Sequence, residues 1–447
     1  MTMRVTILST IMGESGSLLT AGSTYTVGDQ FGQELVNSGR ATDTDRAMAV
    51  PQTELKPYFA TDPLTGAVTG LVGPGGGTIA IPSELFRYLK KWRVALANAI
   101  SGYADAKLAF IGDSTDSGFW AGGTAYTGNR KLSVPQAVAK QFAGRGIPVS
   151  TASQFGTQSV PTASLAAYDP QWTYGAGWVG SSIGSVAGGF LLQNASDTTA
   201  ANYTPVDVNG VALVFDKIEF TYLKNTTYAN FTIAIDGGAA AYTSTQAGSG
   251  ALDTVTITVA SGAHTVNIAK TAPDAAKQLN VASIRCYSST AKTVQVLNLA
   301  GGSMDSTKMA NSAQYFGTIN GLLRVAPHLT VINCTINDAL ANTAVATYTA
   351  NIQAIITAAK VSGDVVLRTG NTGNHGYSGF VLDSDDKYIS ALSDLAVANG
   401  CLFLNIKDRL GQFSEMQTLG FMVDGLHPTQ AGYFDIANPL FTLVKPQ

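Results

Sequence analysis

The segment Lys107-Leu108-Ala109-Phe110-Ile111-Gly112-Asp113-Ser114 is a short apolar run that ends in a turn. A run of this length, bounded by a glycine, is typical of a buried strand. Further runs of this kind alternate with helical periodicity from about residue 293 onward. This alternation predicts a mainly parallel sheet with helices on both faces, a three-layer α/β/α fold. The other expected strands are 293–299, 329–334, 364–369 and 401–406, and the expected helices are 84–100, 133–142, 307–325, 345–361 and 386–399.

Two other regions have different residue patterns. Between about 166 and 292 the helical signal disappears, and five segments predict strands at the spacing of a jelly-roll-like β-sandwich. Residues 1–84 alternate short apolar pieces with turns and predict a small, mostly β domain with one short helix over 29–38. We therefore expect an α/β domain formed by 85–165 and 293–447, which the sandwich of 166–292 interrupts. The five strand segments are 211–223, 230–236, 252–260, 263–269 and 279–287.

Composition narrows the function classes. Charged residues make up 13% of the 447 residues, the net charge is −3, and no Lys/Arg cluster is dense enough to follow a phosphate backbone. This argues against nucleic acid or an anionic membrane as a partner. The odd number of cysteines (Cys286, Cys334 and Cys401) and the lack of paired Cys/His spacing predict no disulfide framework and no metal site. The N-terminus lacks the basic and apolar pattern of a signal peptide.

Ser114 lies just beyond the first strand of the predicted sheet. Open α/β sheets place their sites at this edge. Gly112 allows a tight turn and Asp113 can order the loop, so that the backbone N–H of Ser114 points into the cleft. Taken alone, Gly-Asp-Ser is a common sequence, and a turn in which the serine caps a helix is its more usual structure.

A second signal is Asp424-Gly425-Leu426-His427-Pro428, near the C-terminus. An Asp three residues before a His, on a turn that enters a helix, can place its carboxylate against Nδ1 of the imidazole. This fixes the tautomer and leaves Nε2 to accept a proton from a serine hydroxyl. The same spacing would also suit a helix-capping Asp beside a surface His.

Two weaker signals also follow strands. Asn337, in Thr335-Ile336-Asn337-Asp338, can offer a side-chain amide to a developing oxyanion, although it could equally be a turn residue. Gly302, in Gly301-Gly302-Ser303, lets the backbone N–H approach a substrate closely.

The order of Ser114, Gly302, Asn337 and the Asp424/His427 pair resembles the SGNH (GDSL-type) hydrolase family. The resemblance implies a flavodoxin-like α/β/α fold and a serine esterase that needs no cofactor. It implies that Ser114 is the nucleophile, that His427 is the general base and then acid, and that Asp424 orients His427. The oxyanion hole would be formed by the N–H groups of Ser114 and Gly302 and the side chain of Asn337.

The resemblance covers roughly 105–160 and 293–435, and the sequence departs from the family in two places. Thr335 stands where the family usually has glycine, two residues before the asparagine. The glycine block is short, so Gly301 could take the role assigned to Gly302.

Three further residues are predicted substrate contacts: Asp113, His375 and Trp178. His375 follows the strand 364–369 in a loop that could reach the cleft. Trp178 belongs to a group of aromatic residues that could either stack on sugars, as in a carbohydrate-binding module, or pack inside the sandwich. That group is Trp172, Tyr174, Trp178, Tyr203, Tyr222 and Tyr228.

The N-terminal segments 18–25 and 34–41 resemble segments near the start of phage-encoded virion proteins. This implies a module that docks the chain on phage tail or neck proteins, so that it acts as part of the virion at the host surface. The substrate would be an O-acylated polysaccharide, most simply an O-acetylated one, and a homotrimer would suit such a location. Two alternatives stay open: a receptor-binding virion protein that holds sugar without cutting it, and a broad esterase or lipase for small or lipid esters.

Overall fold

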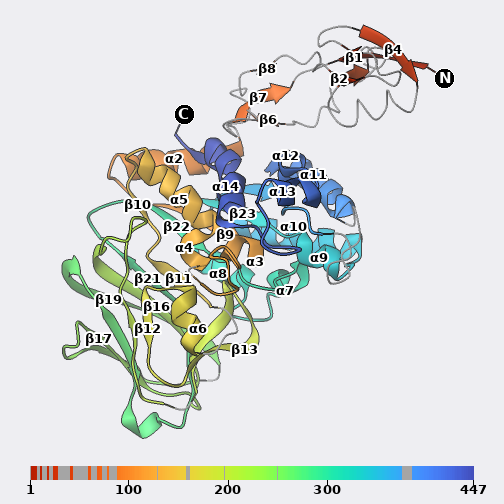
Figure 1. Ribbon diagram of the computed structural model, residues 1–447. Coiled ribbons are helices and arrows are strands. Elements are labelled where there is room, and N and C mark those ends of the chain that lie inside the picture. Colours follow the sequence, from red (N-terminus) through yellow and green to blue (C-terminus); the bar gives the residue numbers. More distant parts are fainter. Residues whose placement is uncertain are drawn as a thin grey trace. The chain divides into compact units, whose positions relative to one another are not determined.

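The computed structural model divides the chain into two compact units, Met1–Leu85 and Phe86–Gln447 (Figure 1). It describes residues 88–446 apart from 128, 158–161, 196, 249 and 375–384, and eight short strands before them. The helix expected over 29–38 lies outside the described residues. The strands of the first unit are β1 (Thr2–Ile7), β2 (Ile11–Met12), β3 (Leu18–Leu19), β4 (Thr24–Gly28), β5 (Ala41–Asp43), β6 (Phe59–Thr61), β7 (Val68–Val72) and β8 (Thr78–Ile79).

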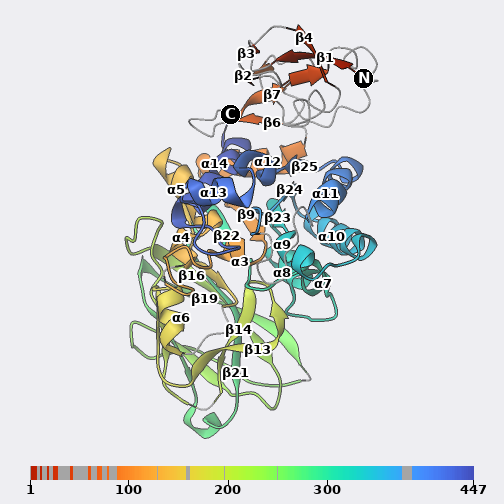
Figure 2. The ribbon, with the colours of Figure 1, turned by 45° about the vertical axis from the view of Figure 1, so that its right-hand side comes forward.

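A parallel sheet organises the second unit (Figure 2). Its strands are β9 (Ala106–Ile111), β10 (Val149–Ser150), β22 (Val294–Asn298), β23 (Leu329–Asn333), β24 (Asp364–Arg368) and β25 (Leu402–Leu404). The spatial order is β10-β22-β9-β23-β24-β25, so β9 lies between β22 and β23. The carboxyl ends of these three strands are therefore adjacent, at a point where the connections turn to opposite sides of β9. Open α/β sheets bind ligands in the crevice at such a point.

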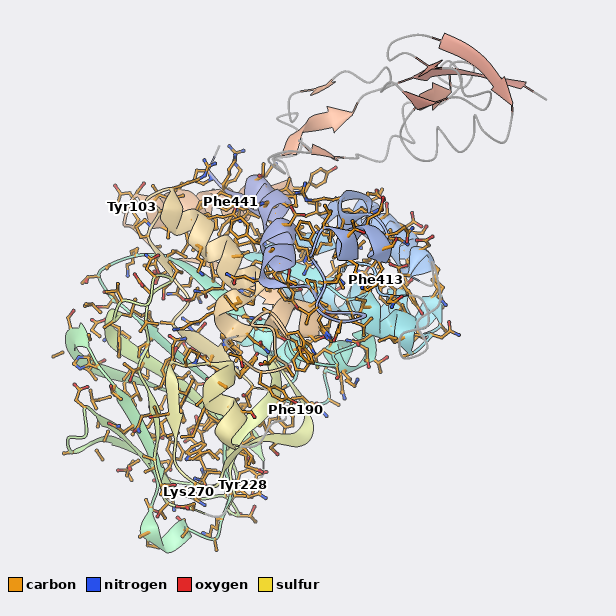
Figure 3. The ribbon with its side chains drawn as sticks, in the orientation of Figure 1. Tyr103, Phe190, Tyr228, Lys270, Phe413 and Phe441 are labelled. Carbon is orange, nitrogen blue, oxygen red and sulfur yellow. The ribbon has the colours of Figure 1, made fainter. Side chains whose placement is uncertain are left out.

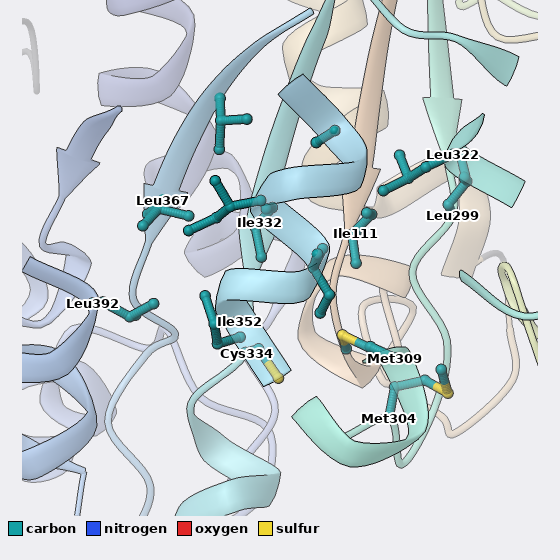
Figure 4. Packing of buried hydrophobic residues seen from close by; sticks show 14 of the residues in the cluster. Ile111, Leu299, Met304, Met309, Leu322, Ile332, Cys334, Ile352, Leu367 and Leu392 are labelled. Carbon is teal, nitrogen blue, oxygen red and sulfur yellow. The ribbon is translucent and has the colours of Figure 1, made fainter. Parts of the chain in front are cut away.

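Helices cover both faces of this sheet. On one face, Ile111, Ile332 and Leu367 from three strands pack against Leu322, Ile352 and Leu392 from three helices (Figure 4). On the other, Phe142 is in ring contact with Trp92 and with Phe441, which Figure 3 labels. The three-layer arrangement thus follows from strands that bury apolar side chains on both faces.

The helices of the second unit are α2 (Lys90–Ile100), α3 (Ser114–Ser117), α4 (Asn129–Leu132), α5 (Val134–Gly144), α6 (Thr162–Tyr168), α7 (Ser306–Ala310), α8 (Thr318–Val325), α9 (Ile336–Leu340), α10 (Val345–Lys360), α11 (Asp386–Asn399), α12 (Ile406–Leu410), α13 (Phe413–Thr418) and α14 (Gln430–Val444). The single helix expected over 307–325 is wrong. It is two helices, α7 and α8, because a turn intervenes and Gly317 caps α8 in an extended conformation. Within the described residues, no helix combines the length and the hydrophobicity needed to cross a bilayer.

In the sequence, the strands of two antiparallel sheets lie between the two segments that form the parallel domain. One has the order β13-β14-β21-β16-β19, with β11 paired to β21, and the other has the order β12-β15-β20-β17-β18. Buried side chains from both sheets, such as Phe220 and Phe231, form one shared core. The strands are β11 (Ser153–Phe155), β12 (Trp172–Tyr174), β13 (Trp178–Val186), β14 (Gly189–Asn194), β15 (Ala201–Tyr203), β16 (Val214–Lys224), β17 (Phe231–Ile235), β18 (Ala240–Thr243), β19 (Ala251–Ala263), β20 (Val266–Lys270) and β21 (Leu279–Tyr287).

The start of this sandwich and the end of one of its strands differ from the expectation. Its pairing begins with β11, before residue 166. β19 also continues to Ala263, whereas the sequence predicted a strand that ends at residue 260. A register shift between Phe215 and Lys217 accommodates this extension, as a β-bulge would.

Candidate active site

Ser114, His427 and Asp424 form one hydrogen-bonded chain of side chains. Ser114 begins α3 directly after β9, and His427 lies just before α14. The distance from Ser114 Oγ to His427 Nε2 is 3.0 Å, and His427 Nδ1 lies 2.9 Å from Asp424 Oδ2. These distances are within the range of a nucleophile, a base and the residue that orients the base.

The Asp424 carboxylate is prepared to hold the imidazole. It accepts hydrogen bonds from the backbone N–H groups of Leu426 and His427 at 2.8 and 2.7 Å. Burial raises the pKa of Asp424, but the hydrogen bonds from His427 and Leu426 outweigh it and leave that pKa below its usual value. The buried amide of Asn371 donates to the Leu426 carbonyl at 2.8 Å and thereby holds this loop.

Asp113 shapes the nucleophile turn from inside. It is fully buried and accepts hydrogen bonds from the Thr115 N–H at 2.8 Å and the Thr115 hydroxyl at 2.6 Å, which caps α3. The prediction that Asp113 contacts substrate is therefore wrong, because its carboxylate points into the protein. Burial raises the pKa of Asp113 to about 6.

A buried ion pair lies beneath the same turn. Asp116, on α3, pairs with Arg368 at the end of β24, and both side chains are almost fully buried. Gly112 packs so closely over Asp116 that a Cβ on Gly112 would lie 2.1 Å from Oδ2 of Asp116. Sequence reasoning missed this pair, because nothing local connects residues that are 252 positions apart.

The sequence predicts the backbone N–H groups of Ser114 and Gly302 as oxyanion donors. Among the described residues, neither the Ser114 N–H nor the Gly302 N–H has a hydrogen-bond partner. The Gly301 N–H, in contrast, donates to the Gly112 carbonyl at 3.1 Å. That bond occupies the Gly301 amide, whereas no described bond occupies the Gly302 amide.

Asn337 lies at the start of α9, after β23. Its Nδ2 donates one hydrogen bond, to the Met304 carbonyl at 2.8 Å. A side-chain amide has a second N–H, which this hydrogen bond leaves available. Thr335, which replaces the expected glycine, accepts a hydrogen bond from the Gly370 N–H at 2.9 Å and so ties this loop to the one after β24.

Three aromatic residues, Phe119, Trp120 and Tyr126, form a group that contacts the imidazole through Phe119. The ring of Phe119 lies 5.0 Å from the ring of His427 between centroids and also contacts the rings of Trp120 and Tyr126. All three are only partly buried. Trp120 has φ of 66°, which is unusual for a bulky residue and marks a constrained backbone. Sequence reasoning missed this group, although aromatic residues so soon after Ser114 could have indicated it.

Of the other predicted substrate contacts, Trp178 does not reach this site. Trp178 is fully buried and its indole N–H donates to the Thr199 carbonyl, so the prediction that it contacts substrate is wrong. Trp172, Tyr203 and Tyr222 are buried in the same core, as the packing alternative anticipated. His375 lies outside the described residues.

Comparison with protein families adds one match. Residues 260–433 match the model of the GDSL-like lipase/acylhydrolase family. The matched range includes Gly302, Asn337, Asp424 and His427, while Ser114 precedes it because most of the sandwich strands intervene. The chain is thus similar to GDSL-like acylhydrolases over residues 260–433, which contain the last sandwich strands and most of the second part of the split domain. A search of curated proteins found no match.

Several solved structures resemble the chain in part. The protein YXIM of Bacillus subtilis has 17% identity and a TM-score of 0.30, and the match covers 60% of this chain and 86% of that one. A family two carbohydrate esterase from Clostridium thermocellum has 12% identity and a TM-score of 0.26, with coverages of 60% and 97%. A catalytic variant of an acetylxylan esterase from Geobacillus stearothermophilus has 15% identity and a TM-score of 0.28, with coverages of 35% and 74%.

Proposed function

We propose that this chain is a serine esterase and that Ser114 is its nucleophile. The observation that carries the proposal is the chain of contacts from Ser114 Oγ through His427 to Asp424, at 3.0 and 2.9 Å. Asp424 holds the proton on Nδ1, so the lone pair of Nε2 faces the serine hydroxyl. A serine placed in this way can be activated by the adjacent base at neutral pH.

The reaction then proceeds in two halves. His427 takes the hydroxyl proton as Ser114 Oγ attacks the ester carbonyl, and the oxyanion is held by the N–H groups of Ser114 and Gly302 and by Asn337. The alcohol leaves with the proton from His427, and an acyl-serine remains. Water, activated by His427, attacks this acyl group and releases the acid and the free serine.

We propose an O-acylated polysaccharide, most simply an O-acetylated one, as the substrate. The support is the aromatic group of Phe119, Trp120 and Tyr126, whose rings are partly exposed and in which Phe119 contacts the ring of His427. Ligand sites combine such apolar faces with a few polar groups that fix orientation. A pyranose ring that carries the ester could lie against these rings while its acyl group reaches Ser114.

The test is acetate release from O-acetylated bacterial surface polysaccharide, with Ser114→Ala as the control. We expect the wild-type protein to release acetate and the variant to release none. Binding of polysaccharide without acetate release would favour a receptor-binding protein instead. Turnover that increases from acetyl to longer acyl chains would favour a lipase.

We also propose that residues 1–84 attach the chain to a phage tail or neck, with the esterase acting at the host surface. The proposal rests on the resemblance of segments 18–25 and 34–41 to segments near the start of phage-encoded virion proteins. Mass spectrometry of purified phage particles tests this proposal. Absence of the chain from the particles would contradict it.

A further inference from the structure

The hairpin turn between β13 and β14 lies against the loop that carries Gly302. The Gly188 N–H donates to the Leu299 carbonyl at 3.0 Å, and the Ala187 N–H donates to the Phe316 carbonyl at 3.1 Å. Leu299 directly follows β22 and stands three residues before Gly302. The backbone of the sandwich is therefore hydrogen-bonded to the proposed oxyanion loop.

The two backbones approach each other so closely that only glycine fits. A Cβ on Gly301 would lie 2.3 Å from the Cα of Gly189, and a Cβ on Gly189 would lie 3.2 Å from the Cα of Gly301. Gly188 and Gly189 also have φ of 91° and 107°, which other residues rarely adopt. Because real Cβ atoms do not come within 3.0 Å of such neighbours, this contact has no room for a side chain.

The oxyanion loop is held from two sides as a result. On the nucleophile side, the Gly301 N–H donates to the Gly112 carbonyl at 3.1 Å. On the opposite side, Gly189 of the hairpin packs against Gly301. The Gly302 amide follows immediately, so its position depends on both contacts. An oxyanion donor contributes fully only when it is held in place before the reaction.

We infer that the β13–β14 hairpin of the sandwich is a positioning element for the oxyanion hole, acting through Gly189 on the Gly302 amide. The inference rests on the proposed function. By this inference, the sandwich contributes to catalysis by fixing the position of an oxyanion donor. A displacement of about 1 Å in a catalytic group can lower the rate about 10²-fold, so a small shift of the hairpin is enough to reduce the rate strongly.

The contact between the hairpin and α8 offers a reversible way to move the hairpin. Gly321, on α8, faces Ala187, and a Cβ on Gly321 would lie 2.6 Å from the Cβ of Ala187. Gly321→Ala therefore pushes the hairpin away, while alanine favours the helix. The double variant Gly321→Ala/Ala187→Gly moves the methyl group to the other side of the contact and removes the clash.

The experiment measures kcat and KM for a chromogenic acetate ester, and the affinity for a boronic acid whose serine adduct places an oxygen in the oxyanion hole. For Gly321→Ala we expect kcat and boronate affinity to fall together by about tenfold or more, with KM nearly unchanged. The double variant should recover to within about threefold of the wild type.

Three outcomes are decisive. Wild-type kcat in Gly321→Ala, with a thermal unfolding midpoint showing a folded protein, would overturn the inference. So would a loss that the double variant does not recover. If instead Ser114→Ala hydrolyses the ester like the wild type, the proposed function itself fails, which keeps the two failures distinguishable.

Discussion

The two described His–Asp contacts lie in different regions of the molecule. They differ in the group that contacts the second nitrogen of the imidazole. At the edge of the parallel sheet, His427 has Asp424 on Nδ1 and the Ser114 hydroxyl on Nε2. In the sandwich, His264 Nδ1 lies 2.7 Å from Asp236 Oδ2, but Nε2 lies 2.8 Å from the Ala260 carbonyl.

The second partner decides what each imidazole can do. A carbonyl can only accept, so both nitrogens of His264 must donate to satisfy their contacts, and the protonated ring is favoured. The hydrogen bond to Asp236, followed by that to Ala260, accordingly raises the pKa of His264. A hydroxyl can give its proton away, so His427 can act as a base. An Asp beside a His is therefore no sign of catalysis until the group at the far nitrogen is known.

The largest expected effect is the loss of the catalytic imidazole. We expect His427→Ala to lower kcat/KM for a chromogenic acetate ester by about 10⁴-fold or more, because no base then activates Ser114. His264→Ala is the matched control and should keep wild-type kinetics. Equal losses in the two variants would show that the comparison between the pairs is wrong.

The next effect concerns the oxyanion side of the sheet edge. Asn337→Ala should lower kcat by about 10²–10³-fold, since one preorganised donor is removed while Ser114 and His427 stay in place. Asn399→Ala, which removes a hydrogen-bonded amide at the remote end of α11, controls for the loss of an ordinary amide. A kcat near that of the wild type in Asn337→Ala would exclude this residue from the oxyanion hole.

A pH-dependent effect on stability is expected at the buried nucleophile turn. The pKa of Asp113 is raised to about 6, so the folded protein binds the proton of this carboxyl more tightly than the unfolded chain does. The protonated carboxyl therefore adds to the free energy of unfolding at low pH. This contribution is lost as the pH rises through about 6. Asp113→Asn cannot ionise and should escape this loss, which amounts to about 3 kcal/mol at most. Urea unfolding of both proteins between pH 4 and 7 measures the difference, and parallel profiles would contradict the expectation.

A smaller effect is expected at the aromatic group beside His427. Trp120→Ala should lower kcat/KM for acetylated polysaccharide by about tenfold and leave kcat/KM for a small chromogenic ester unchanged. The reason is that the proposed contact of the Trp120 ring is with the sugar and not with the acyl group. Tyr103→Ala removes an exposed aromatic residue elsewhere and should change neither. An equal loss for both substrates would point to a disturbed nucleophile turn instead of a sugar contact.

The smallest effect returns to His264. Because its pKa is raised in the folded state, the His264–Asp236 contact stabilises the protein below the usual pKa of histidine and loses that contribution as the pH rises through the raised value. The stability difference between wild type and His264→Ala should therefore shrink from pH 6 to pH 9. Thermal unfolding across this range measures it, and a constant difference would argue against the ion pair.

The sequence predicted the parts of the site that local patterns encode. Ser114, Gly302 and Asn337 each follow an apolar strand, and adjacent parallel strands bring such residues to one edge. Asp424 and His427 are three residues apart, so their contact is a local property of one turn. In the structure, Ser114, His427 and Asp424 are hydrogen-bonded to one another, and Gly302 and Asn337 follow the two strands that flank β9.

The rest depends on partners that only the fold selects. The Arg368–Asp116 pair and the contact of Gly189 with Gly301 join segments far apart in sequence. The glycine-rich hairpin gave no strand signal, because glycine is depleted in strands and gains its partners only through pairing. Trp178 shows a further limit: its sequence neighbours do not reveal that its ring faces the core.

The measurement that tests the central claim most directly is the site of labelling by a fluorophosphonate, which transfers its phosphonyl group to an activated serine hydroxyl and releases fluoride. We predict one phosphonyl group per chain, located on Ser114 by peptide mass spectrometry, with esterase activity lost in proportion and no labelling of Ser114→Ala. Labelling at another residue, or full activity in a protein completely labelled at Ser114, would contradict the claim that Ser114 is the nucleophile.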